Sequence, residues 1–98
     1  LLAKDYFEMA YRMGNLEAGF QLGRLYWFGT NQIETNLPRA LDILTDVGQK
    51  GNFEAQWMLA NLYTKGSPVT PKNLSEAKKW YRLYNQSISS KNLTLVNN

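Results

Sequence analysis

The sequence predicts an all-α fold, an α/α superhelical solenoid of about two and a half helix-turn-helix repeats with a period of 37 residues. Two observations predict it: an ungapped internal repeat, and apolar residues at helical spacing inside each repeat. Residues 14–50 align with residues 51–87, and the identical pairs are Gly14/Gly51, Asn15/Asn52, Glu17/Glu54, Ala18/Ala55, Leu22/Leu59, Leu25/Leu62, Tyr26/Tyr63, Gly29/Gly66, Asn36/Asn73, Leu37/Leu74 and Ala40/Ala77.

The same period divides the chain into units. Extending it backwards aligns Ala3 with Ala40 and Ala77, so the chain starts inside a repeat. We therefore expect it to be an excised piece of a longer chain. The predicted parts are residues 1–13, the second helix of a truncated repeat; residues 14–50 and 51–87, two complete repeats that close an array spanning 1–87; and residues 88–98, a polar C-terminal tail or cap.

The first half of each complete repeat is typical of a helix with defined ends. Asn15 is a good N-cap, and Glu17 lies in the first turn, where the helix dipole favours a carboxylate. Gly29 is expected to end the helix, since glycine accepts the backbone angles found there. The apolar face repeats at i, i+4, i+7 and i+8, as Ala18, Leu22, Leu25 and Tyr26 and again as Ala55, Leu59, Leu62 and Tyr63.

The second half of each repeat predicts another helix. Asn73 and Glu76 have the spacing of a capping box, and Pro38 fits a first turn because its missing donor has no partner there. Glycines at positions 14 and 51 leave almost no loop before the next unit, so we expect sharp antiparallel turns. The apolar face runs at i, i+3, i+4 and i+7, as Ala40, Ile43, Leu44 and Val47 and again as Ala77, Trp80, Tyr81 and Tyr84.

Composition argues against catalysis. The chain has no His and no Cys, which removes the common general base, the thiol nucleophile and the usual transition-metal ligands. Asp42 and Asp46 share a helix face, but such pairs are ordinary on helices and we interpret them as structural or solvated rather than as an acid-base pair. We therefore expect no enzymatic activity, no cofactor and no metal.

Charge and hydropathy restrict the classes of partner that we expect for the chain. The net charge of +3 is mild and spread along the chain, and the cluster of Lys78, Lys79 and Arg82 is interpreted as a solvated outer face, so we expect no nucleic-acid binding. No apolar stretch approaches the roughly 18 residues of a membrane span. We expect a soluble chain, with the compartment left open between bacterial periplasm and cytoplasm and the oligomeric state undetermined.

The repeat resembles the Sel-one-like repeat, a relative of the tetratricopeptide repeat. Three groups of residues carry the resemblance: Ala18, Leu22, Gly23, Leu25, Tyr26 and Gly29; then Ala55, Leu59, Ala60, Leu62, Tyr63 and Gly66; then Ala77, Trp80 and Tyr81. The chain departs from the family pattern where Ile43 and Leu44 replace Trp-Tyr and where Ala60 replaces Gly. After Tyr84 no further Gly-Asn start follows.

The resemblance implies a protein-protein interaction module, an adaptor or scaffold whose first helices line a concave binding surface. It implies an alternative as well, an immunity protein that neutralises a secreted bacterial toxic effector. Stacked helix pairs independently favour binding, because they leave an extended curved face. A structural spacer without a groove partner stays open as a third hypothesis.

The repeat also indicates which positions are free to vary. Trp27 and Phe28 are apolar where the family carries polar residues, and such aromatics make good interface anchors. The alternative is that they pack on the loop 30–35 or on an upstream unit. An aromatic is common in the family at the positions of Phe20 and Trp57, which we interpret as core. The predicted partner-binding residues are Gln21, Arg24, Trp27, Phe28, Met58, Asn61 and Lys65.

Overall fold

The computed structural model describes residues 2–97, with side chains as far as Lys91; Leu1 and Asn98 lie outside the described residues. Within this range the chain forms five α-helices and no strand, which confirms the predicted all-α solenoid. The helices are α1 (Ala3–Arg12), α2 (Leu16–Phe28), α3 (Leu37–Gln49), α4 (Phe53–Lys65) and α5 (Leu74–Asn97).

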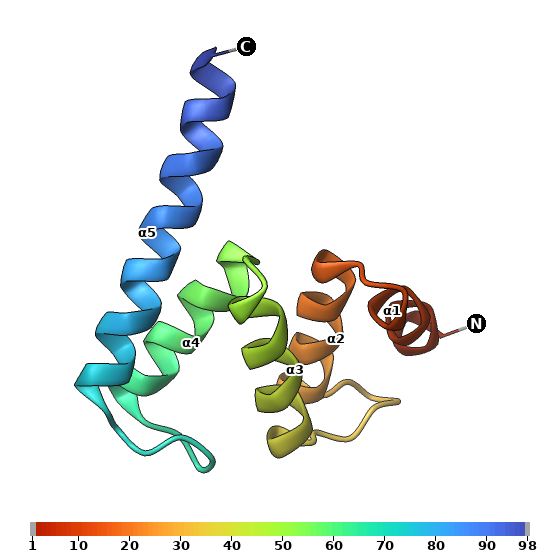
Figure 1. The fold of residues 1–98 in the computed structure, drawn as a ribbon. Coiled ribbons are helices and arrows are strands. Elements are labelled where there is room, and N and C mark those ends of the chain that lie inside the picture. The colour runs from red at the N-terminus through yellow and green to blue at the C-terminus, as the bar shows by residue number, and fades with distance from the viewer. Residues whose placement is uncertain (1, 98) are drawn as a thin grey trace.

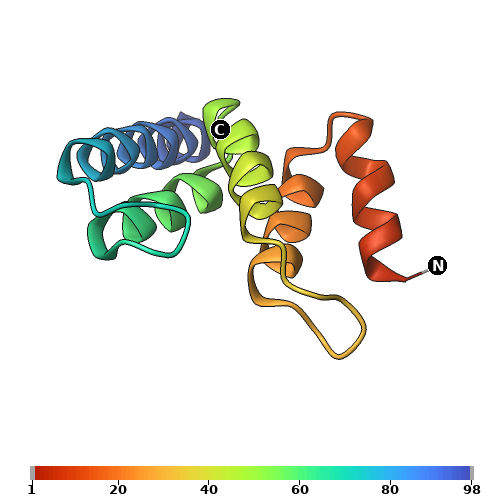
Figure 2. The same cartoon turned by 90° about the horizontal axis from the view of Figure 1, so that it is seen from below.

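The helices stack as antiparallel hairpins. Each helix packs mainly on its neighbours in the chain, so α3 lies between α2 and α4, and α5 packs on α4 (Figure 1). Viewed along the other direction, α1 closes one side of the stack and α4 with α5 the other (Figure 2). The Cα atoms span 42 × 34 × 18 Å, and this flat shape is typical of a short repeat array.

Asparagine side chains begin four helices as the repeat predicts. Asn15 Oδ1 accepts a hydrogen bond from the Ala18 amide at 2.9 Å, and Asn52 Oδ1 accepts one from the Ala55 amide at 2.7 Å. Asn36 and Asn73 do the same at the starts of α3 and α5. Only this half of the capping box predicted at Asn73 is formed among the described residues, because the Asn73 amide donates to the Tyr63 carbonyl instead.

Glycines end both first helices. Gly29 and Gly66 have φ angles of +71° and +81°, a region that side chains with a Cβ rarely enter, and each amide closes the last helical turn. The loops that follow share one hydrogen-bond pattern although only the second contains prolines. The Thr30 and Ser67 hydroxyls each accept from two amides further along, so the loops have matching cores despite their different composition.

The core runs through the layer where first and second helices meet. Leu22, Leu44 and Leu59 are completely buried, and Trp80 is 1% exposed. The predicted burial of Leu59 is therefore confirmed. Leu22 and Leu59 sit at equivalent positions of the repeat, as do Ile43 and Trp80, so each hairpin contributes similar buried positions to the core.

The junctions between units exchange large and small residues. Where α1 meets α2, the Tyr11 ring fills the space above Gly19, so that a Cβ on Gly19 would lie 2.6 Å from Tyr11 Cδ1. One period later the small residue is Gly48 on α3 and the larger one is Gln56 on α4, whose Nε2 donates to the Gly48 carbonyl at 2.9 Å. Large and small residues have thus changed places between the two junctions, and a Cβ on Gly48 would meet Leu59 and Trp80, each at 3.1 Å.

Polar contacts also tie α1 to α3. The Tyr11 hydroxyl donates to Asp46 Oδ2 at 2.6 Å, and Arg39 pairs with Glu8 at 3.0 Å. Burial and the hydrogen bond to Asp46 raise the pKa of Tyr11 to about 12, and that bond, helped by Lys50, lowers the pKa of Asp46. Asp46 therefore has the structural role expected of it.

Helix α5 is longer than the other second helices. It continues to Asn97, so the segment that we set apart as a tail or cap from residue 88 begins inside this helix. Figure 1 shows its last turns extending beyond the rest of the stack. Near the end of the packed part, Ser87 Oγ donates to Gln56 Oε1 at 2.8 Å. A capping role for residues 88–98 stays a prediction.

Candidate partner-binding groove

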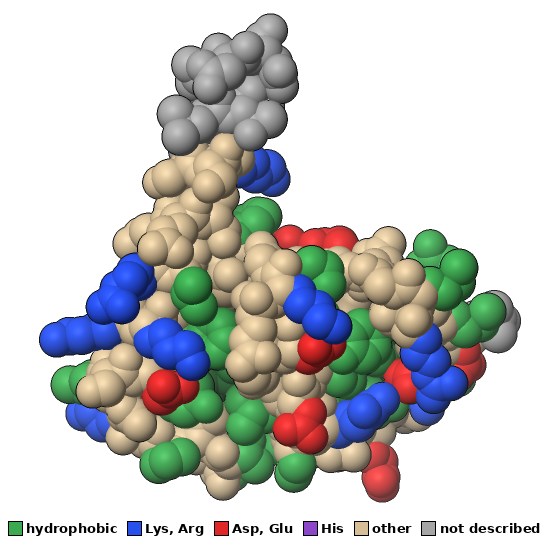
Figure 3. All heavy atoms as spheres, viewed as in Figure 1, with side chains coloured by type: hydrophobic (Ala, Val, Ile, Leu, Met, Phe, Trp, Pro, Cys, Tyr) green, Lys and Arg blue, Asp and Glu red, His purple; other side chains and the backbone are tan. Residues whose placement is uncertain are grey.

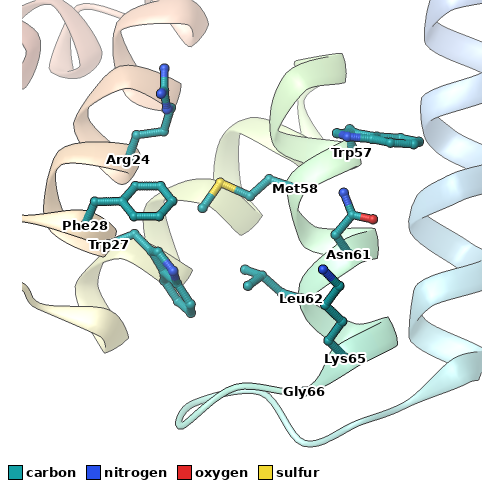
Figure 4. A pocket seen from close by; sticks show the side chains of 9 residues that line it. All are labelled: Arg24, Trp27, Phe28, Trp57, Met58, Asn61, Leu62, Lys65 and Gly66. Atoms are coloured by element: carbon teal, nitrogen blue, oxygen red, sulfur yellow. The ribbon is translucent and has the colours of Figure 1, made fainter.

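The two first helices face each other across a groove of about 440 Å³ (Figure 4). Phe28 of α2 and Met58 of α4 point toward each other from its two walls. This volume lies within the range of ~300–1,000 Å³ over which protein pockets bind ligands. The lining residues are Arg24, Trp27, Phe28, Trp57, Met58, Asn61, Leu62, Lys65 and Gly66.

The groove brings together all but one of the residues predicted for partner binding. Gln21 is the exception, because it lies one turn before Arg24 and lines a separate hollow of about 220 Å³ beside α1. There the Gln21 amide donates to Glu17 Oε1 at 3.1 Å. Arg24 and Phe28 line both hollows, so they separate the groove from this smaller one.

The interpretation of Trp57 as a core residue is wrong, whereas that of Phe20 is confirmed. Phe20 is 7% exposed and belongs to the buried cluster that includes Ala55 of the next first helix. Trp57 occupies the equivalent position one unit later but is 47% exposed. Within residues 2–97 no first helix follows α5, so nothing covers Trp57 as α4 covers Phe20.

Trp57 is held in place by aromatic rings of α5. Its ring centroid lies 5.5 Å from that of Tyr81 and 5.0 Å from that of Tyr84. The Tyr81 hydroxyl donates to Asn61 Oδ1 at 2.8 Å, which orients a further groove residue. Sequence reasoning missed Trp57 and Leu62 because both occupy the positions of buried or partly buried residues in the repeat. The helix that comes next decides their exposure.

The aromatic wall on α2 is accessible. Phe28 is 67% exposed, so it is not packed into the loop after α2, and Trp27 is partly buried. Opposite them, Met58 and Leu62 are also partly buried. An exposed apolar surface made of aromatic and methionine side chains is typical of protein contact sites.

The charges in the groove are all positive. Arg24 and Lys65 line it, and no carboxylate does. Arg24 Cζ lies 5.7 Å from the centroid of the Phe20 ring. Among the described residues the ion pairs use Arg12, Arg39, Lys50 and Lys79, so neither groove cation has an acidic partner within 4 Å.

A third hollow, of about 230 Å³, continues the groove toward α5 and shares Trp57 and Met58 with it. Its lining includes Glu54. Burial raises the pKa of Glu54, as do the hydrogen bond with Glu17 and the negative charge of Glu17, while Arg24 opposes this shift. Glu54 of this lining thus already interacts with Arg24 and with a second acid, Glu17.

The described residues form neither a metal-binding cluster nor a membrane-spanning helix. Among the residues whose side chains are described, no group of three or more acidic, His or Cys residues is placed to hold a metal ion. In the same part of the chain, every helix is too short or too polar to cross a membrane. Figure 3 shows one face of the molecule, on which several basic side chains gather on the side of α5 and others lie among apolar and acidic ones.

The helices and their packing define a helical-repeat solenoid. The Sel1 repeat family model matches residues 1–15, 16–44 and 53–83, and the chain therefore belongs to the Sel1 repeat family. This confirms the resemblance drawn from the repeat pattern. Proteins of this family are generally protein-interaction modules on a fold that is typically non-catalytic.

Two solved structures share the fold. A Sel1 repeat protein from Oxalobacter formigenes has a TM-score of 0.76 and 27% identity, over 86% of this chain and 33% of its own length. A protective antigen of uropathogenic Escherichia coli with an SLR fold has a TM-score of 0.76 and 29% identity, over 85% of this chain and 18% of its own length. The chain thus spans a third or less of these relatives. No curated protein matches it.

Proposed function

We propose that the chain is a protein-protein interaction module, an adaptor or scaffold that binds a segment of a partner protein on its concave helical surface. One observation carries the proposal: large aromatic side chains are exposed in a groove between two first helices whose framework residues match. Phe28 and Trp57 remain 67% and 47% exposed, whereas Phe20 and Trp80 are buried in the core.

The energetics favour this use of the groove. Aromatic side chains and arginine dominate the binding energy of many protein interfaces, especially near the centre of the contact. Trp27, Phe28 and Trp57 supply the aromatic surface, and Arg24 lies one turn before Phe28. The tyrosine contacts of Trp57 hold its ring in place before binding, which lowers the ordering cost of association.

The immunity function remains a narrower version of the same proposal. An immunity protein binds one folded toxic effector tightly, whereas an adaptor binds exposed segments with modest affinity. The two solved relatives come from bacteria, which supports a bacterial setting, in the periplasm or the cytoplasm. We propose no catalytic role.

Selection from a random-peptide display library tests the proposal. The wild-type chain is compared with a Trp27→Ala/Phe28→Ala variant, and Tyr6→Ala/Met9→Ala serves as a matched control because those residues are 61% and 56% exposed on α1. We expect peptides that bind the wild type and the control but not the groove variant, with all three chains equally helical. Binders that ignore the groove substitutions would place the binding surface elsewhere.

A further inference from the structure

The shape and charge of the groove restrict the kind of segment that it can bind. Its centre is apolar, formed by Trp27, Phe28, Met58 and Leu62, while the cations Arg24 and Lys65 stand beside this centre. Figure 4 shows Arg24 and Lys65 extending from different helices, on either side of the apolar side chains. A partner that fills this space meets apolar surface first and positive charge at its edges.

Electrostatic complementarity then selects among apolar partners. A carboxylate beside Lys65 gains an ion pair without displacing an existing one, since the described residues hold no acid within 4 Å of Lys65. A lysine or arginine brought to the same place meets like charge. Complementary charges of this kind set specificity and association rate.

The structure assigns to the groove a partner segment that carries an aromatic or aliphatic anchor flanked by Asp or Glu. This inference rests on the proposed function and adds the chemistry of the partner to it. The anchor packs between Phe28 and Met58, and the carboxylates pair with Lys65 and, more weakly, with Arg24.

Arg24 and Lys65 should attract a partner carboxylate to different degrees, for a structural reason. Arg24 already faces Glu54, and its guanidinium lies near the Phe20 ring, so part of its charge is balanced within the chain. Lys65 is exposed at the C-terminal end of α4 with no such neighbour described. Substituting Lys65 is therefore expected to weaken the binding of an acidic segment more than substituting Arg24 does.

The composition of groove-dependent peptides is the test. Peptides from a fully random library that bind wild type but not Trp27→Ala/Phe28→Ala are sequenced. We expect enrichment of Asp and Glu next to aromatic or aliphatic residues. Groove-dependent peptides with no acidic enrichment, or with basic enrichment, would overturn the inference while leaving the proposed function intact. A complete lack of groove-dependent peptides would overturn both.

Charge substitutions on the protein sharpen the result. Lys65→Gln should lower the affinity for an enriched peptide about two- to fivefold, which is the effect of one exposed ion pair. Added salt should remove most of the difference in affinity between this variant and the wild type. Lys78→Gln, an equal charge change on exposed α5 surface, should leave binding unchanged. If Lys65→Gln has no more effect than Lys78→Gln, the ion pair is absent and the inference fails.

The three tryptophans report where the peptide binds. Trp27 and Trp57 line the groove, whereas Trp80 is 1% exposed in the core. In a proton-nitrogen NMR titration with an enriched peptide, the indole signals of Trp27 and Trp57 should shift and that of Trp80 should not. Equal shifts of all three, or a shift of Trp80 alone, would contradict binding in the groove.

Discussion

The unit formed by α2 and α3 and the unit formed by α4 and α5 share their main-chain contacts but differ in the environment of one aromatic residue. Asn36 and Asn73 donate from their amides to Tyr26 and Tyr63 at 2.7 and 2.9 Å. Phe20 of α2 and Trp57 of α4 occupy equivalent positions, yet Phe20 is buried and Trp57 is exposed. The repeat determines the backbone structure of a unit, while the adjoining unit determines which of its side chains stay exposed and accessible to a partner.

The interfaces between units show the same division. Tyr11 packs on Gly19 at the first interface. At the next interface Gln56, at the position of Gly19, donates to the carbonyl of Gly48, at the position of Tyr11. Large and small residues therefore change places between the two interfaces, and the contact that joins the units changes with them.

A large expected loss of stability tests the shared framework. Leu22 and Leu59 are equivalent and completely buried, so Leu22→Ala and Leu59→Ala should each lower the free energy of unfolding by about 2–5 kcal/mol. Urea denaturation followed by circular dichroism measures this. Leu74→Ala, at a side chain that is 57% exposed, is the control and should change stability by less than about 0.5 kcal/mol. A similarly small effect of Leu59→Ala would contradict the stacking.

A smaller effect tests the exchange between Tyr11 and Gly19. A Cβ on Gly19 would lie 2.6 Å from both Tyr11 Cδ1 and Val47 Cγ1, so Gly19→Ala should cost about 1–3 kcal/mol through overpacking. Combining it with Tyr11→Ala removes one of the clashing groups. We expect the double variant to be more stable than the sum of the single effects, by about 1 kcal/mol in a double-mutant cycle. Strict additivity would show that the two sites are independent.

The smallest effect concerns the hydrogen bond between Tyr11 and Asp46, which has no counterpart at Gly48. Tyr11→Phe should cost about 1 kcal/mol at neutral pH, measured by urea denaturation. The bond lowers the pKa of Asp46 in the folded state, so its contribution is present above the ordinary value of 3.8 and is lost as the pH falls through the lowered pKa.

The same bond acts at alkaline pH through Tyr11. Its pKa rises from 10.0 to about 12 in the folded state, so the contribution is complete below pH 10 and is lost as the pH rises toward 12. Tyr11→Phe should therefore flatten the stability profile at both ends. An unchanged profile would show that other groups cause the pH dependence.

Local patterns were enough to predict the framework of the fold. Asn15, Leu22 and Gly29 act within their own helix or hairpin, so periodic spacing and helix-end chemistry identify them. Most groove residues could be found in the same way, as unusual side chains at variable repeat positions, with Trp27 and Phe28 as the clearest signals.

What sequence reasoning missed depends on contacts between units. The position of Trp57 is buried when another first helix follows, and its exposure here comes from the absence of that helix within residues 2–97. Gln21 lies one turn too early on α2 to reach the groove and faces the hollow beside α1 instead. Neither outcome is encoded in one repeat, because each depends on which helix packs against it.

We propose that the equivalent aromatics Phe20 and Trp57 serve the fold in one unit and partner binding in the next. This proposal is tested most directly by measuring unfolding and peptide binding in Phe20→Ala and Trp57→Ala. We predict that Phe20→Ala costs about 3–5 kcal/mol of stability, while Trp57→Ala costs clearly less and weakens groove-dependent peptides at least tenfold. If Trp57→Ala destabilised the chain as much as Phe20→Ala and left peptide affinity unchanged, the account would be contradicted.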